Sequence, residues 1–461
     1  MFIGTLETHQ AEAVDRLRTM PRALLADVVG LGKTVTALAH ICDLYERGEL
    51  GRPGRPIWWV TSANLIQQAV NEMSKFTPSL AVIDQNHTLF SPNKPKLMDE
   101  FRSAFPRGPE VVVVSFEHVH QHSLTLLKRF GKPAMFVVDE AMAVKNFQGK
   151  RHKELASLTR RPPGSASARV LAMTATPYEN NPLETYALMR IIDAPGLWSR
   201  ADFDRFVEYS EEYDIPGTNQ RVEAQPIGWI PEHVAEFREF FERYTIRRTA
   251  EDAQLSLPVH VGDRHRFVPL TVRQAARYKA FENVKGAAGH TLRTLAGRSA
   301  GEESALVDAF MDWLENESNG ERAVVYCESL GVVKLLGEAL DALGIGYRSI
   351  EGQVATKYRN RYVAEFNDAS SDVRIFIGSK VLEVGLNLHH TCRNLISLDA
   401  SDNPQREAQR EGRIRRIGSP FATYRHLTFL PDTPVARTKV DSLAAKSRNA
   451  DLLLGAPAPT Y

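Results

Sequence analysis

A short glycine-rich stretch near the N-terminus constrains the fold more than any other feature of the sequence. DVVGLGKT (27–34) follows an apolar segment, RALLAD (22–27), that has the composition of a buried strand. A helical pattern beginning TVTALAH comes directly after it. A strand, a glycine turn and a helix in this order are typical of a phosphate-binding loop, because glycines let main-chain N–H groups surround a phosphate.

Every part of a nucleotide site is present in this stretch. The main chain of Gly30, Leu31 and Gly32 is predicted to surround the phosphates. Lys33 is expected to reach the terminal phosphates, and the hydroxyl of Thr34 is expected to bind magnesium. The predicted cofactors are therefore ATP and magnesium, and the alternative is a chance Gly-Lys-Thr in a surface turn.

A second motif argues against chance. The apolar segment MFVVDE (135–140) ends in two carboxylates, of which Asp139 is predicted to hold magnesium and Glu140 to polarise the attacking water. TATP (174–177) follows at another strand end. An acidic pair alone is weak evidence, but three such elements in this order are hard to obtain by accident.

Apolar, β-branched segments recur in two series, as buried parallel strands would. The first series comprises 22–27, 56–61, 111–116, 135–140 and 169–176, and the second comprises 323–329, 347–350, 374–379 and 394–399. Between the series, apolar positions in 305–315 recur at helical spacing. We predict two α/β lobes with mostly helical insertions between them. The expected boundaries are 1–195 for the first lobe, 196–320 for insertions and linker, 321–430 for the second lobe and 431–461 for a C-terminal tail or brace.

Composition is consistent with this division. A chain of 461 residues is too long for one core at roughly 100–200 residues per domain. Lys and Arg number 57 against 56 Asp and Glu, so any nucleic-acid surface must be local. Three widely spaced cysteines indicate neither a zinc module nor a disulfide framework, and no segment approaches the ~18 apolar residues of a membrane span. We expect a soluble, cytoplasmic monomer without a membrane partner.

The order of the motifs resembles that of helicase superfamily two. HQAEAV (9–14) precedes the phosphate loop, and its Gln10 matches the glutamine with which that family reads adenine. In the second lobe, SKVLEVGLNL (379–388), which includes Gly385, resembles the fifth motif of the family. The resemblance implies two RecA-like parallel-sheet lobes in tandem. It also implies that Thr174 and Thr176 of TATP, and Gly385, couple the nucleotide site to movement.

QREGRIRRIG (409–418) resembles the sixth motif. The resemblance implies that Gln409 takes part in coupling and that Arg413 and Arg416 are arginine fingers. Such an arginine is worth roughly 10³–10⁵ in rate when it reaches the transferring phosphate. The alternative is a solvated basic surface, which the composition of the segment alone would favour.

Several further stretches resemble the Swi/Snf-like branch in particular, above all TIRRTAEDA (245–253) with Arg247 and Arg248. The resemblance implies a DNA-stimulated ATPase that translocates on double-stranded DNA and grips phosphates through strand-end hydroxyls. The candidates are Thr61, Ser62, Ser115, Ser329 and Ser379. Each of them could equally satisfy a neighbouring main-chain group.

The sequence also departs from the family pattern. Met142 stands where the family has the histidine that links the acidic pair to the third motif, and Asp402 stands where it has tryptophan. Two alternatives therefore stay open: a strand-separating helicase on single-stranded DNA or RNA, and a nucleotide-gated nucleic-acid-binding module with weak hydrolysis. So compact a motor suits a bacterium or bacterial virus.

A histidine triplet invites a metal interpretation. His118, His120 and His122 alternate as residues of a strand would, which would place all three on one face. No carboxylate or thiol stands nearby at ligand spacing. We interpret them as structural or surface histidines.

Overall fold

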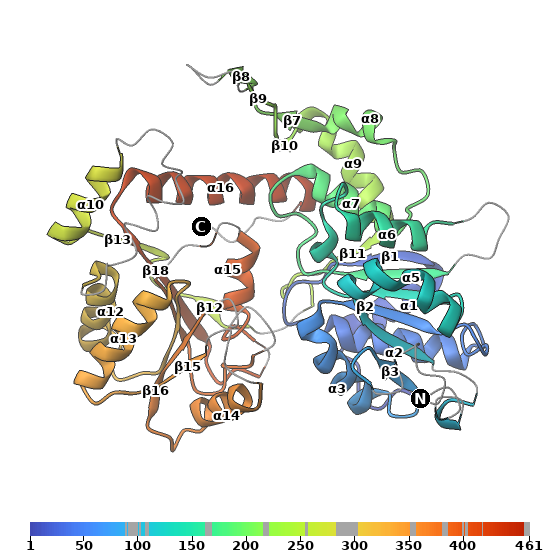
Figure 1. Cartoon of the computed structure of the whole chain (residues 1–461), viewed down its shortest axis with the longest axis horizontal. Coiled ribbons are helices and arrows are strands. Elements are labelled where there is room, and N and C mark those ends of the chain that lie inside the picture. The colour runs from blue at the N-terminus through green and yellow to red at the C-terminus, as the bar shows by residue number, and fades with distance from the viewer. Residues whose placement is uncertain are drawn as a thin grey trace. The chain divides into compact units, whose positions relative to one another are not determined.

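The computed structural model describes residues 1–87, 90, 100, 103–106, 110–161, 168–214, 221–253, 257–282, 303–350, 356–379, 386–398, 401, 404–416 and 418–455. The chain divides into two compact units (Figure 1). The first comprises Met1–Gln254 with Asn449–Ala456, and the second comprises Leu255–Arg448 with Pro457–Tyr461. Each unit is built on its own parallel sheet with helices, which confirms the predicted fold class.

The sheet of the first unit has the strand order β11-β1-β6-β5-β2-β4-β3 and is parallel throughout. Its strands are β1 (Arg22–Leu25), β2 (Ile57–Thr61), β3 (Val82–Asp84), β4 (Val111–Ser115), β5 (Met135–Val138), β6 (Arg169–Met173) and β11 (Thr245–Ile246). Only β6 separates β1 from β5, so the segments that follow these two strands meet at the carboxyl edge of the sheet. All five predicted strands of this lobe are confirmed, whereas β3 and β11 are too short to stand out in the sequence.

Helices cover both faces of this sheet, which explains its nearly continuous apolar strands. Neighbouring residues of one strand enter different cores, because side chains alternate across a sheet. Leu24 and Trp58 pack on one face, and Leu25 and Trp59 pack on the other. The helices of the first face are α5 (Phe116–Phe130), α6 (Lys150–Thr159), α7 (Pro182–Ile191) and α9 (Pro231–Tyr244), and those of the second are α1 (Thr8–Thr19), α2 (Lys33–Glu46) and α3 (Ile66–Phe76).

The stretch expected between the lobes is divided between the two units. Its first part, with α8 (Arg200–Phe203), β7 (Val207–Tyr209), β10 (Pro226–Trp229) and α9, extends the first unit's core through Phe203, Phe237 and Trp229. The C-terminal segment joins the same unit, where the Trp229 N–H donates to Asn449 Oδ1 at 3.2 Å. The later part of the stretch expected between the lobes belongs to the second unit.

The sheet of the second unit has the order β12-β18-β17-β14-β16-β15, and β13 also pairs with β18. Its strands are β12 (Val259–His260), β13 (His265–Val268), β14 (Ala323–Tyr326), β15 (Gly346–Ile350), β16 (Val373–Gly378), β17 (Asn394–Ser397) and β18 (Thr423–Pro431). Its helices are α10 (Val272–Glu282), α12 (Ala305–Asn316), α13 (Leu330–Ala342), α14 (Thr356–Asn367), α15 (Pro404–Glu411) and α16 (Pro434–Leu454), whose last turns belong to the first unit. The predicted apolar face of α12 is confirmed, because Phe310 and Trp313 are fully buried.

The alternation of the histidine triplet does not come from a strand, because all three residues lie on α5. β4 ends at Ser115, whose Oγ accepts a hydrogen bond from the His118 N–H at 3.1 Å and so caps α5. This N-cap starts a helix within two residues of the strand end. Helical spacing brings the rings of His118 and His122 to 4.7 Å, and burial, assisted by His122, lowers the pKa of His118.

Candidate nucleotide site and nucleic-acid interface

The predicted phosphate loop joins β1 to α2, which begins at Lys33. Gly30 has φ 95° and Gly32 has φ 78°, a region that favours glycine. A Cβ added at Gly32 would meet Gln10 Nε2 at 2.4 Å, whereas nothing lies within 4 Å of one at Gly30. Gly32 is therefore needed for space as well as for conformation.

Two side chains of α1 hold this loop from outside. Gln10 Nε2 donates to the Leu31 carbonyl at 3.1 Å, and His9 Nε2 lies 3.0 Å from the same oxygen. Both side chains are buried, and Gln10 Oε1 in turn accepts from the Glu7 N–H. Gln10 thus positions the loop, while adenine recognition by this residue stays a prediction.

The ammonium of Lys33 folds back on its own loop. Its Nζ donates to the Asp27 carbonyl at 2.8 Å and more weakly to Val28 at 3.4 Å. Burial lowers the pKa of Lys33, while the charges of Glu140, Asp27 and Asp139 oppose that shift. The lysine is therefore close enough to interact with the acidic pair, and a phosphate offers it a stronger acceptor than two neutral carbonyls.

The acidic pair lies directly after β5. The Asp139 N–H donates to the Val60 carbonyl at 2.8 Å, and Glu140 has φ 51°. A left-handed non-glycine residue stores strain of the kind found at functional sites. Burial and the neighbouring Glu140 raise the pKa of Asp139 to about 7, against the effect of Lys33.

The donor set at this edge fits magnesium. Carboxylate and hydroxyl oxygens are the ligands that this hard cation prefers, and Asp139 and Thr34 supply them. A divalent cation would also offset the repulsion between the two adjacent carboxylates that raises the pKa of Asp139.

An ion pair beside the loop was not predicted from the sequence. Asp27 is fully buried, and the guanidinium of Arg248 donates to its two oxygens at 3.0 and 2.5 Å. Arg248 also donates to the His9 carbonyl. Arg248 is brought there because β11 pairs with β1, and beyond the strand ends the Val28 N–H donates to the Arg248 carbonyl. The TIRRTAEDA resemblance pointed to Arg248 but not to what it contacts.

The predicted coupling threonines lie just after β6. Thr174 Oγ1 donates to the Thr176 carbonyl and accepts from the Thr176 N–H, both at 3.2 Å. The Thr174 N–H donates to the Leu25 carbonyl of β1. This turn is thereby tied to the strand that leads into the phosphate loop, and a coupling role stays a prediction.

Lys145 links the segment after the acidic pair to the segment after TATP. Its Nζ binds Glu184 Oε1 at 2.9 Å and forms a second ion pair with Glu179. Glu184 also accepts from the main-chain N–H of Glu179 and of Asn180. Met142 is buried in the apolar core instead. A polar connection between the two segments therefore exists without a histidine at position 142.

In the second unit, the residues of the sixth motif lie at the end of α15. Arg413 is nearly buried, and its carbonyl accepts from the Leu388 N–H at 3.0 Å. Arg416 binds the side chain of Asn387. These bonds join the sixth-motif segment to the end of the fifth. Gln409 is half-buried on α15, while Gly385 and Asp402 lie outside the described residues.

The candidate nucleic-acid contacts all lie at carboxyl ends of strands. Thr61 and Ser115 are register partners of β2 and β4, and both are buried. Ser62 follows Thr61, while Ser329 and Ser379 follow the adjacent strands β14 and β16, all half-buried. The structure thus places three of them at neighbouring strand ends in the first unit and two in the second. Ser115 caps α5, and DNA contact by any of the five stays a prediction.

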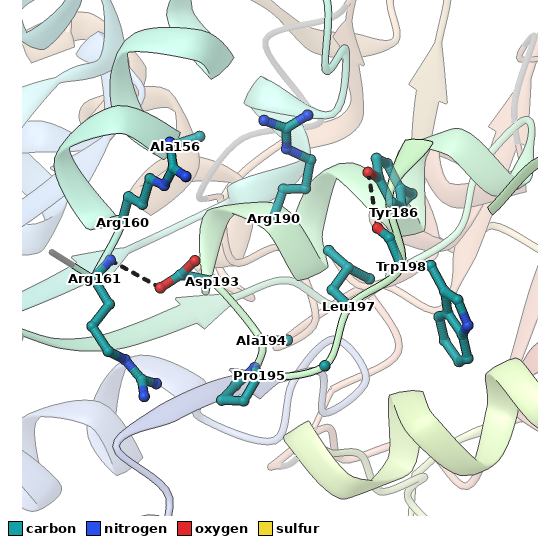
Figure 2. A pocket seen from close by; sticks show the side chains of 11 residues that line it. Ala156, Arg160, Arg161, Tyr186, Arg190, Asp193, Ala194, Pro195, Leu197 and Trp198 are labelled. Atoms are coloured by element: carbon teal, nitrogen blue, oxygen red, sulfur yellow. Dashed lines mark hydrogen bonds between the residues drawn. The ribbon is translucent and has the colours of Figure 1, made fainter. Parts of the chain in front are cut away.

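A cavity of about 450 Å³ lies elsewhere in the first unit (Figure 2). Arg160, Arg161 and Arg190 line it together with Asp193, whose Oδ2 accepts from the Arg161 N–H at 3.0 Å. The same carboxylate lies 3.6 Å from Arg22, the first residue of β1. The cavity is therefore at the amino ends of the strands, away from the nucleotide site at their carboxyl ends.

Comparison with known proteins places the sequence in a family. The SNF2-related domain matches residues 9–322, and the Helicase conserved C-terminal domain matches residues 304–418. The chain is 23% identical to the ATP-dependent DNA helicase DDM1 of Arabidopsis thaliana over 92% of its length and 59% of the relative. It is also 23% identical to the transcription regulatory protein SNF2 of Saccharomyces cerevisiae, over 90% of this chain and 26% of that one.

The chain is also similar to a further curated relative and to a solved structure. The CHD3-type chromatin-remodeling factor CHR7 of Arabidopsis thaliana is 23% identical over 90% of this chain and 35% of its own length. The chain thus spans between 26% and 59% of these curated relatives. The solved Sulfolobus solfataricus SWI2/SNF2 ATPase core in complex with dsDNA is similar with a TM-score of 0.45 and 21% identity, covering 97% of this chain and 92% of that one. Among the described helices, none is long and apolar enough to cross a membrane. On the extent of the domain match, this chain belongs to the SNF2-related family of helicase superfamily two.

Proposed function

We propose that the chain is a DNA-dependent ATPase that translocates on double-stranded DNA, with ATP hydrolysed between its two units. One observation carries the proposal: at the carboxyl edge of the first sheet, Lys33 of the phosphate loop lies close enough to an acidic pair for the two carboxylates to affect the pKa of the lysine. Glu140 of that pair has a left-handed backbone. The names of two relatives, an ATP-dependent DNA helicase and a chromatin-remodeling factor, support the same activity.

In the proposed reaction, Lys33 and the loop amides orient the terminal phosphate, and Glu140 accepts a proton from the attacking water. Magnesium held by Thr34 and Asp139 would neutralise charge on the phosphates. Arg413 and Arg416 would stabilise the transferring phosphate when the units close, so that hydrolysis drives a two-state movement along the track. Monomeric action in the cytoplasm is part of the proposal.

The test is steady-state ATP hydrolysis with no nucleic acid, single-stranded DNA, duplex DNA or duplex RNA, with Lys33→Ala as the blank. We expect the strongest stimulation by duplex DNA and no turnover by the blank. Stronger stimulation by single strands or RNA would replace the proposal with the strand-separating helicase. Stimulation by none of them would favour the gated binding module.

Translocation itself needs a separate measurement. Displacement of a third strand from a duplex should require ATP and should proceed without separation of the two duplex strands. Ser62→Ala and Ser379→Ala are suitable variants for testing the proposed DNA contacts, because both residues are half-buried at strand ends. They should raise the duplex concentration that gives half-maximal stimulation while leaving hydrolysis without DNA unchanged.

A further inference from the structure

The buried side of the sixth-motif segment carries a charge network that binding of nucleotide or DNA does not explain. His426 of β18 is 4% exposed, and its Nδ1 lies 2.9 Å from Glu411 Oε1 of α15. Its Nε2 lies 3.0 Å from Ser397 Oγ of β17. Because an ionised carboxylate only accepts, Nδ1 carries the proton that it donates to Glu411. One ring therefore joins two strands to the helix.

Glu411 is the best-supported carboxylate of this network. It accepts from the Tyr424 hydroxyl at 2.7 Å and from Arg264 Nη1 at 2.6 Å, in addition to His426. Burial would raise its pKa, but His426, Arg264 and Tyr424 outweigh burial and hold the pKa of Glu411 well below its usual range. The carboxylate is thus charged and fixed from three sides.

A second carboxylate lies one helical turn earlier. Glu407 Oε1 accepts from Arg410 Nη1 at 3.0 Å and from the Ser401 N–H at 2.7 Å. Its other oxygen lies 3.4 Å from His426 Nε2. The two ring nitrogens of His426 therefore address successive turns of α15, which fixes both the rotation of the helix and its position along β18.

The order Ser397, His426, Glu411 is that of a nucleophile, its base and an orienting acid. Ser397 is completely buried, however, and no substrate can reach its hydroxyl. The arrangement therefore positions structure and does not form a second catalytic centre.

What the network positions is the turn that follows α15. The Glu411 carbonyl accepts from the N–H of Ile414 and from that of Arg415, at 3.0 and 2.7 Å. The segment that carries Arg413 and Arg416 is therefore hydrogen-bonded to the main chain of the same residue whose carboxylate binds His426.

We propose that His426 is a positioning residue for the arginines of the sixth motif, acting through the Glu411 carboxylate. The inference rests on the proposed function, since it assigns the two arginines to the transferring phosphate. An arginine finger acts only in the transition state, so a misplacement of about 1 Å lowers turnover by up to about 100-fold without weakening nucleotide binding.

The test uses two variants, each of which keeps a nitrogen at one of the two ring-nitrogen positions of His426. In His426→Asn, the amide nitrogen takes the place of Nδ1 and still donates to Glu411. In His426→Gln, it takes the place of Nε2, near Ser397 and Glu407, and no longer donates to Glu411. We expect DNA-stimulated kcat to fall by about 10- to 100-fold in the Gln variant with KM for ATP unchanged. The Asn variant and Ser397→Ala should keep most of the activity.

A double-mutant cycle separates positioning from general damage. If His426 acts through the arginines, His426→Gln combined with Arg413→Ala or with Arg416→Ala should lose no more activity than the arginine variant alone. Equal losses in the Gln and Asn variants, or losses that multiply in the double variants, would overturn the positioning role. A wild-type protein without DNA-stimulated hydrolysis would instead overturn the proposed function, which the wild-type assay shows independently.

Discussion

The two units both hold their functional segments through buried carboxylates, but they differ in how many partners each carboxylate has. In the first unit, the carboxylate of Asp27 belongs to the functional loop, and Arg248 reaches it from the neighbouring strand β11 and its extension. In the second unit, the carboxylates also belong to the functional segment, but one of them is shared by a histidine and a tyrosine of β18 and by Arg264, which directly precedes β13. A glycine loop has few side chains to hold, so it is anchored at its flanks and through a main-chain carbonyl. A helix end is anchored through its side chains.

The largest expected effects are losses of turnover, and they distinguish a residue of the first unit that binds ATP from one of the second unit that acts only in the transition state. Lys33→Ala and Arg416→Ala should each lower DNA-stimulated kcat by about 10³-fold or more. Only Lys33→Ala should also weaken ATP binding, because the lysine contacts phosphate in the ground state, whereas a finger acts in the transition state. Equilibrium titration with a fluorescent ATP analogue checks this. Equal loss of affinity in both variants would contradict the assignment.

The buried pair of Arg248 and Asp27 should contribute much more to the free energy of unfolding than an exposed ion pair does. Arg248→Met leaves the buried carboxylate of Asp27 without its bidentate partner, which costs about 3–5 kcal/mol. Adding Asp27→Asn should recover much of that loss. Arg243→Ala is the matched control, because its pair with Glu239 is exposed and worth about 0–1 kcal/mol. Urea unfolding followed by tryptophan fluorescence measures all three, and similar losses for Arg248→Met and Arg243→Ala would refute the anchor.

Substitutions of the two glycines of the phosphate loop test whether Gln10 restricts the loop. Gly30→Ala and Gly32→Ala should both cost about 1–2 kcal/mol of backbone strain, since both positions have positive φ. Gly32→Ala should weaken ATP binding further, because its Cβ would displace the Gln10 side chain. Combining it with Gln10→Ala should relieve that extra loss. An equal effect of the two single substitutions would show that Gln10 does not restrict the loop.

The smallest expected effect is a pH dependence in the first unit. Burial lowers the pKa of His152 to about 4, against the hydrogen bond that its Nδ1 makes with the Val144 carbonyl. The unfolded chain takes up a proton near the ordinary value of about 6.5, so stability is lost as pH falls from about 6.5 toward 4. His152→Asn keeps the donor without the titration.

Melting temperatures at pH 7.5 and pH 5.5 test this expectation. The loss of melting temperature between the two should be smaller in His152→Asn than in the wild type. His233→Asn, at an exposed position of α9, serves as the control and should change as the wild type does. An unchanged difference in His152→Asn would show that this histidine does not set the acid sensitivity.

Prediction from the sequence succeeded where a short local pattern carries the physics. The predicted strands, the glycine loop and the apolar face of α12 are recovered because each depends on alternation, helical spacing or glycine conformation within a few residues. The spacing of two at His118–His122 would place the residues on one face only in a strand, and the Ser115 cap starts a helix there instead. The middle stretch could not be divided in advance, because its strands are two to four residues long and are defined by their partners.

By itself, the sequence determined the two series of buried strands, the order of the motifs and the residue types at the nucleotide site. Those follow from local geometry and from chemistry that few residue types can supply. Only the tertiary structure decided what anchors the site: Arg248 on Asp27, Lys145 on Glu184, and His426 on Glu411. Each pair joins residues between 15 and 221 positions apart. Such partners are chosen by strand order and burial, because a buried charge is tolerated only where the fold delivers its counterpart.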